Sequence, residues 1–354
     1  MVKKLITSFL FLIIVFVPPL KAQNQSSSVT VIGKYAGEFM AIGVGGRALG
    51  MGGAYVAVAN DVLAGYYNPA GLARIDYPEI SLMHDERYGS LVNYDYAAVA
   101  IPYGKDMSFG LSIMRLGVDG IPDTRQALVD PNTGKVIYDI NSPSAVLDYN
   151  LITEFSNQDW VIYFSFAKKQ SDKFYFGANT KVIYESLGQY NAWGIGFDLG
   201  AQYLPFNNFT LGANIQDLTT TLVAWNTGRN ELITPTLKVG AAYQLDILGG
   251  IISPALDLDI RFENREYASY FHLGPVSFDS HVGLEYNYKN IFMVRGGYND
   301  VKQFTIGAGI KLPKLNIDYS FARFSAAAAD RLPDTHRISL MLSLEELKFK
   351  RPGS

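Results

Sequence analysis

The sequence contains no cysteine among its 354 residues, and only 18% of the residues are charged. The lack of cysteine excludes a disulfide-built fold and any zinc or iron–sulfur site with cysteine ligands. Beyond the N-terminal region, no stretch approaches the ~18 consecutive apolar residues of a membrane-spanning helix. Hydrophobic residues still make up 48% of the chain, which argues against disorder. They are therefore abundant but finely divided along the sequence.

The first 22 residues predict a secretory signal peptide. Two lysines precede an unbroken apolar run over residues 9–17, and the small residue Ala22 precedes the expected cleavage point. The run is too short to cross a bilayer. Cleavage would leave 27 basic and 33 acidic residues, a formal net charge of −6, which argues against nucleic acid as a partner. We therefore expect an exported protein whose residues 23–32 form a linker.

From residue 78 onward, segments of about ten residues alternate apolar with polar or small residues. In residues 193–203, for example, Trp193, Phe197 and Tyr203 share one face of a strand, and Asp198 and Gly200 share the other. A soluble β-sandwich would give the same alternation. Aromatic residues near the ends of the apolar faces favour a membrane barrel, in which such residues form girdles at the two bilayer interfaces.

The connections between these segments support the same architecture. Tight turns alternate with longer connections, notably residues 118–157, 217–234, 264–278 and 325–334, and about 14 strands fit between residues 78 and 344. Short turns on one side and long loops on the other are typical of outer-membrane barrels, as is an even number of strands. We therefore predict an all-β fold, a transmembrane antiparallel β-barrel over 78–344 followed by a polar tail over 345–354.

Residues 33–77 differ from the rest because they are rich in glycine and show little alternation. Residues 43–48 match the nucleotide-loop pattern GxGxxA, but this signal is weak without a surrounding βαβ unit, and the downstream pattern is all-β. The motif residues are Gly45, Gly46, Arg47, Gly50, Gly52, Gly53, Asn68, Pro69, Ala70 and Gly71. Glycine at these positions permits close backbone packing in a confined space.

The stretch 45–73, GGRALGMGGAYVAVANDVLAGYYNPAGLA, resembles the N-terminal hatch of FadL-like outer-membrane barrels, which carries an Asn-Pro-Ala motif. With further matches at 211–218, 294–299 and 335–340, the chain looks closer still to the PorV/PorQ family. The resemblance implies a 14-stranded barrel with the hatch inside its lumen and a role in type IX secretion. It implies the translocon barrel and cargo C-terminal domains as partners, besides outer-membrane lipid. The polar tail departs from the usual terminal aromatic residue.

Catalytic and metal-binding patterns are weak. The four histidines do not form an HExxH motif, and no Gly-x-Ser-x-Gly elbow occurs. His281 and Glu285 share the predicted inward face of one strand, but a lone polar pair in a lumen usually packs against a plug. We therefore expect no enzymatic activity, no metal and no cofactor.

Charged side chains of both signs fall on the predicted inward faces of the strands. A buried charge needs a partner, so we predict a paired network that holds the hatch, with Arg47 as its bridge to the lumen acids. The network residues are Asp198, Asp257, Asp259, Arg261, Glu285, Arg295, Asp318 and Arg337.

Two functions compete at this stage. The leading interpretation is a non-enzymatic outer-membrane protein of the PorV/PorQ type, which binds its partners through outward loops. Leu222, Val223 and Trp225 in the connection 217–234 are the candidate contact residues, unless they fold into the lumen or extend the strands. The alternative is a FadL-like channel with a hydrophobic ligand in the lumen, and a barrel without any transport is a third possibility.

Overall fold

The computed structural model describes residues 37–139, 141–262, 269–325 and 334–353. The predicted signal peptide and linker lie outside these residues. The strands of the main sheet are Glu79–Arg87 (β1), Val92–Tyr103 (β2), Met107–Asp123 (β3), Thr153–Ser171 (β6), Phe174–Leu187 (β7), Tyr190–Phe206 (β8), Phe209–Gln216 (β9), Thr221–Trp225 (β10), Asn230–Ile233 (β11), Thr236–Tyr243 (β12), Leu245–Ile247 (β13), Gly250–Arg261 (β14), Phe271–Leu273 (β15), Val276–Tyr288 (β16), Phe292–Tyr298 (β17), Gln303–Leu312 (β18), Leu315–Phe324 (β19) and Thr335–Ser343 (β20).

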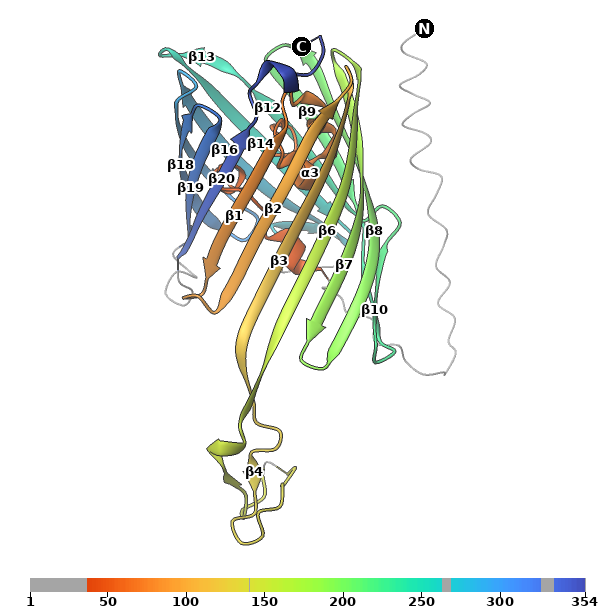
Figure 1. Cartoon of the computed structure of the whole chain (residues 1–354), viewed down its shortest axis with the longest axis vertical. Coiled ribbons are helices and arrows are strands. Elements are labelled where there is room, and N and C mark those ends of the chain that lie inside the picture. The colour runs from red at the N-terminus through yellow and green to blue at the C-terminus, as the bar shows by residue number, and fades with distance from the viewer. Residues whose placement is uncertain (1–36, 140, 263–268, 326–333, 354) are drawn as a thin grey trace. The chain divides into compact units, whose positions relative to one another are not determined.

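The sheet closes on itself, because β1 pairs antiparallel with both β2 and β20 (Figure 1). Four strands of the sheet are short additions to it. β10 pairs with β8 and β11, β13 pairs with β14, and β15 pairs with β16. The other fourteen form the wall, each hydrogen-bonded to the strands before and after it. The prediction of an antiparallel barrel of about 14 strands is confirmed.

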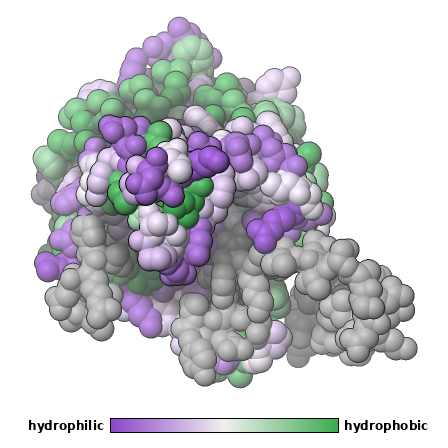
Figure 2. Space-filling view, turned by 90° about the horizontal axis from the view of Figure 1, so that it is seen from below, coloured by the Kyte–Doolittle hydropathy of each residue, from purple (hydrophilic) through white to green (hydrophobic). Residues whose placement is uncertain are grey.

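The wall strands turn apolar side chains outward, and their inward faces carry polar and small residues together with large buried side chains such as Tyr94, Tyr163 and Ile183. On β8, Trp193 is 58% exposed, whereas its neighbour Ala192 is fully buried. Trp193 and Tyr203 lie ten residues apart, which is about 33 Å along a strand and about 25 Å across a membrane at the tilt usual in such barrels. Figure 2 shows hydrophobic residues along the sides and hydrophilic residues over the end facing the viewer.

Strands β3 and β6 extend well beyond the rest of the wall as a projecting hairpin, which we call the arm (Figure 1). Its tip carries the short pair Leu128–Val129 (β4) and Val146–Leu147 (β5), followed by a 3-10 turn, Tyr149–Leu151 (η3). The predicted loop 118–157 was therefore too long, because the ladder continues past Val118 to Asp123. A bulge after Val118 shifts the alternation there, which hides the strand from a period-2 pattern.

The segment between residue 37 and the first strand contains Glu38–Ala41 (η1), Gly46–Gly50 (α2), Ala64–Tyr67 (α3) and Pro69–Arg74 (η2). No helix among the described residues is long and apolar enough to cross a membrane. The end of the barrel that carries the arm is called the loop end below, and the end with the tight turns is called the turn end. The chain passes from η2 into β1 at the turn end, where the tail with Leu347–Phe349 (η5) also lies (Figure 1).

Candidate functional site

Residues 37–77, called the plug below, pack against the inward faces of the strands, and most of the residues between 43 and 75 are buried. That the plug acts as a hatch stays a prediction. Three tyrosines form its centre: the ring centroids of Tyr55 and Tyr67 are 5.0 Å apart, and those of Tyr66 and Tyr67 are 4.8 Å apart. Tyr67 accepts from the backbone N–H of Val44 at 3.0 Å and donates to its carbonyl at 3.0 Å. The Tyr67 hydroxyl thus supplies hydrogen-bond partners to a plug backbone that has little regular secondary structure.

Polar side chains of the wall supply hydrogen-bond partners for the irregular backbone of the plug. Buried N–H and C=O groups outside helices and sheets need such partners. Asn179 donates to the carbonyl of Gly65 at 2.8 Å, Asn214 to that of Tyr67 at 2.9 Å, and Gln202 to that of Ala59 at 2.8 Å. Asp257 accepts from the N–H groups of Tyr55 at 2.6 Å and Val56 at 2.8 Å. The polar inward face is thus a lining matched to the plug.

The Asn-Pro-Ala motif connects the plug to the wall. The Asn68 side chain accepts from the Ala70 N–H at 3.2 Å and so caps η2. Its amide nitrogen donates to the carbonyl of Val56 within the plug and to that of Ala201 on β8, each at 3.0 Å. One side chain therefore fixes the start of η2 both to the rest of the plug and to the barrel.

Glycines on the inward faces make room for the plug backbone. A Cβ atom at Gly200 would lie 2.2 Å from the Asn68 side-chain oxygen, and one at Gly177 would lie 2.5 Å from the carbonyl carbon of Pro69. A Cβ atom at Gly212 would lie 2.5 Å from the Val56 carbonyl oxygen. Such distances are too short for a carbon atom, so the strand glycines and the motif are complementary in shape.

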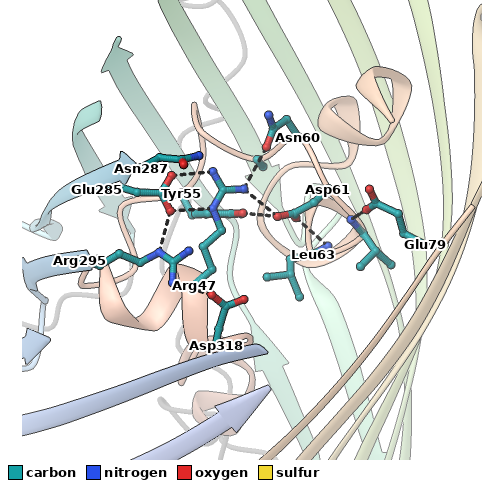
Figure 3. A network of polar contacts seen from close by, with 12 residues as sticks. Arg47, Tyr55, Asn60, Asp61, Leu63, Glu79, Glu285, Asn287, Arg295 and Asp318 are labelled. Atoms are coloured by element: carbon teal, nitrogen blue, oxygen red, sulfur yellow. Dashed lines mark hydrogen bonds and ion pairs between the residues drawn. The ribbon is translucent and has the colours of Figure 1, made fainter. Parts of the chain in front are cut away.

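Arg47 joins the plug to the charged groups at the turn end, as Figure 3 shows. Its guanidinium donates to both carboxylate oxygens of Glu285 at 3.0 Å and to Asp61 at 3.0 Å. Arg295 donates to Glu285 at 2.7 Å and to Asp318 at 2.6 Å. Burial by itself would lower the pKa of Arg47, but the carboxylates of Glu285 and Asp61 raise it well above its ordinary value. Arg47 is therefore a permanent cation.

The other predicted lumen charges are all buried but do not form a single network. Lys181 lies 2.9 Å from both Asp198 and Asp217. A second cluster pairs Asp259 with Lys238 at 2.5 Å and with Arg261 at 3.5 Å. Separate clusters form because inward side chains reach only strands one or two positions away around the barrel, and the plug fills the space between the clusters.

Two predicted residues stand apart from these groups. Arg337 donates to Asp85 at 2.9 Å, so its partner lies on β1. One carboxylate oxygen of Asp257 accepts hydrogen bonds from two backbone N–H groups of the plug, those of Tyr55 and Val56. Among the described residues, no group of three or more His, Cys, Asp or Glu side chains is placed to hold a metal ion.

The prediction that Leu222, Val223 and Trp225 lie in an exposed loop is wrong. They form β10, which pairs with β8 and β11. Val223 is fully buried, and Trp225 packs against the buried core. Leu222 alone is exposed, on the outward face. The apolar residues of this segment therefore belong to the sheet, as a short strand beside β8.

A cavity of about 520 Å³ lies between the plug and the loop end of the barrel. Apolar side chains such as Ile42, Leu116 and Phe324 contribute to its lining, and so do the charged residues Glu38, Arg87, Asp279, Asp300 and Arg337. The plug forms part of the floor, because Glu38 and Ala41 of η1 also line the cavity. A lining of both apolar and charged side chains suits a small amphipathic molecule.

Comparison with known proteins identifies the fold. No family model matches the sequence, and no curated protein matches it. The toluene transporter TbuX of Ralstonia pickettii is similar in structure, with a TM-score of 0.55 and 16% identity over 85% of this chain and 97% of that one. The toluene transporter TodX of Pseudomonas putida gives a TM-score of 0.50 and 14% identity over 85% and 97%.

A FadL homologue of Pseudomonas aeruginosa is similar at a TM-score of 0.50 and 13% identity, over 84% of this chain and 96% of that one. At such identities the likeness concerns the fold. The chain is therefore a β-barrel with the FadL-like outer-membrane fold.

Several residues of the site carried no recognisable signal in the sequence. Asn179, Gln202 and Asn214 were visible only as polar positions of alternating strands, and their partners are backbone atoms of the plug. Arg351 in the tail was also missed. A lone arginine in a polar terminal segment resembles a solvated surface residue, yet this one is buried.

Proposed function

We propose that the protein is a non-enzymatic outer-membrane channel that takes up small hydrophobic or amphipathic molecules from the loop end. The observation that carries the proposal is the cavity of about 520 Å³ between the plug and the loop end, with its mixed lining of apolar and charged side chains. Its volume is in the range of small-molecule sites. The names of the similar structures, which include toluene transporters, agree with an apolar substrate.

Passage of a ligand requires a route around the plug, because the plug fills the lumen. The wall is irregular next to it, between β9 and β10. Asp217 and Thr220 have positive φ angles of 54° and 58° there. In the described conformation, Lys181 pairs with Asp217, and the N–H of Leu218 donates to the Phe197 carbonyl at 2.8 Å. We propose that this irregular segment, or the plug itself, moves during transport.

The test is calorimetric titration of the purified protein in nanodiscs with toluene and with laurate. The variant Leu116→Trp fills the cavity from β3. Leu111→Trp is the matched control, since Leu111 is exposed on the outward face of the same strand. We expect binding of at least one probe to the wild type and to the control, and its loss in Leu116→Trp. Absence of binding to the wild type, or equal binding to both variants, would refute the proposal.

A second candidate is a PorV/PorQ-type role in type IX secretion, with translocon or cargo proteins as partners. The arm favours it. Tyr138 and Tyr149 at the tip are 85% and 76% exposed, and exposed aromatic residues are frequent in protein interfaces. Residues 119–154 contain six acidic and two basic residues, a net charge of −4, so the tip suits a basic protein surface.

Replacing residues 124–152 by a two-residue Asn-Gly turn separates the two functions. If the arm binds secretion partners, cells with this variant retain ligand uptake but lose cargo from the culture medium. The double variant Tyr138→Ser/Tyr149→Ser should give a weaker form of the same defect. Normal secretion in both variants would count against the second candidate and leave the channel proposal unaffected.

A further inference from the structure

The tail is the feature that neither proposed function uses. It begins after β20 and crosses the turn end, where its first half is tied to the turn after β18. Glu346 accepts from Lys314 at 3.1 Å, and Lys311 lies 3.5 Å from Glu345. The Leu344 N–H donates to the Pro78 carbonyl at 2.9 Å. The tail thus follows the barrel rim from β18 toward β1.

The second half of the tail contains a buried arginine. Arg351 is only 6% exposed. Its guanidinium donates from Nε and Nη2 to the carbonyl of Ile75 at 3.0 and 2.8 Å. It also donates from Nη1 to the carbonyl of Met107 at 2.9 Å and from Nη2 to the Ser108 hydroxyl at 2.7 Å. The Arg351 backbone N–H donates to the Asp76 carbonyl at 2.8 Å.

These contacts join three parts of the chain that are far apart in sequence. Ile75 and Asp76 lie at the end of the plug, in the connection from η2 to β1, whereas Met107 and Ser108 begin β3. Any displacement of η2 from the barrel has to move Ile75. Because the planar guanidinium contacts three acceptor groups at once, it resists that movement in a way that a single donor cannot.

We propose that the tail is a clasp that holds the C-terminal half of the plug in the barrel, with Arg351 as its locking residue. Release of Arg351 would free the connection at Ile75 and lower the free energy needed to displace η2. The clasp controls the mobility of the plug from the turn end, whatever molecule or partner the loop end receives. It therefore does not depend on the proposed ligand.

The experiment is hydrogen exchange of the full chain in nanodiscs, read by mass spectrometry. The reporters are the amide of Gly71 in η2 and that of Ile75, which caps the end of η2; they donate to the carbonyls of Asn68 and Leu72. We expect Arg351→Ala to raise their exchange rates at least tenfold and Arg351→Lys to raise them less. Amides of β16 should exchange as in the wild type. Lys348→Ala is the matched control, since Lys348 is exposed and pairs only locally with Glu346.

A second variant, Ser108→Ala, removes one acceptor on the wall without changing the tail. It should raise exchange at Gly71 and Ile75 by a smaller factor. Planar-bilayer recordings should show more frequent openings in Arg351→Ala than in Lys348→Ala. Unchanged exchange of the η2 amides in Arg351→Ala would overturn the clasp. An equal rise in β16 would overturn it too, because it would show general destabilisation.

Discussion

The guanidinium of Arg47 in the plug and the carboxylate of Glu285 on β16 form a two-point ion pair, with both N–O distances at 3.0 Å. It is the most direct charged link between plug and wall in Figure 3. Arg295 approaches the same carboxylate at 2.7 Å from the next strand. The pair therefore couples the position of the plug to a charge cluster of the wall.

Replacing Arg47 tests this coupling. We expect Arg47→Ala to weaken plug docking by about 1.5–3 kcal/mol, the range for hydrogen bonds to charged groups. Arg47→Lys should recover part of the loss, because it keeps the charge but not the two-point geometry. The measurements are protease resistance of residues 37–77 and single-channel conductance. If Arg47→Ala matched the wild type in both, the link would have no role in docking.

Two neighbouring glycines on β17 give a matched test of the shape of the lining. A Cβ atom at Gly297 would lie 2.4 Å from the Gly52 N atom, whereas the nearest atom to one at Gly296 is 3.9 Å away. Gly297→Ala should therefore loosen the plug, at a cost of about 1–3 kcal/mol for overpacking, and Gly296→Ala should not. Limited proteolysis of the plug compares the two. Equal rates would show that the plug does not need the glycine.

The double role of Asn68 can be separated by substitution. Asn68→Asp keeps the oxygen that caps η2 but places a carboxylate beside the carbonyls of Val56 and Ala201. We expect a loss of about 1–3 kcal/mol of docking free energy, the cost of unsatisfied buried groups. Asn68→Ser should keep the cap and lose the bridge. The measurement for both variants is hydrogen exchange at the Gly71 amide. An exchange rate in Asn68→Asp equal to that of the wild type would contradict the bridging role.

Lys181 neutralises two buried carboxylates, those of Asp198 and Asp217. Lys181→Met leaves both without this cation and should destabilise the barrel by about 3–5 kcal/mol, the usual effect of breaking a buried ion pair. The measurement is the temperature at which the band of the folded barrel disappears in a heat-modifiability gel. Lys105→Met in the exposed β2–β3 turn is the control. Adding Asp217→Asn to Lys181→Met should restore part of the lost stability.

The alternation of the sequence was sufficient to predict the barrel. The pattern of 193–203, with Trp193 and Tyr203 outward, follows from the two-residue period of a strand and holds in the structure. The pattern failed where a local irregularity interrupts it. The bulge after Val118 interrupts the alternation and concealed the arm. The chain turns at Asp217 and Thr220, where φ is positive, so the alternation of β9 does not continue into β10 and the segment was predicted as a loop.

The site could be predicted only in outline. The inward charges were visible as a class, but their grouping into separate clusters depends on which strands are adjacent and on how the plug fills the lumen. The partners of Asn179, Gln202 and Asn214 are backbone atoms more than a hundred residues away. No local pattern encodes such a pairing, because the irregular backbone of the plug has no sequence period.

By itself, the sequence determined that the chain forms antiparallel strands with one apolar and one polar face, because this depends only on the residue period and on hydrophobic burial. Only the tertiary structure decided what the polar face contacts. Closure of β1 onto β20 encloses the plug, so inward amides, glycines and charges become its lining. The same closure brings Arg351 within hydrogen-bond distance of the Ile75 carbonyl, because the end of the last strand lies next to the start of the first.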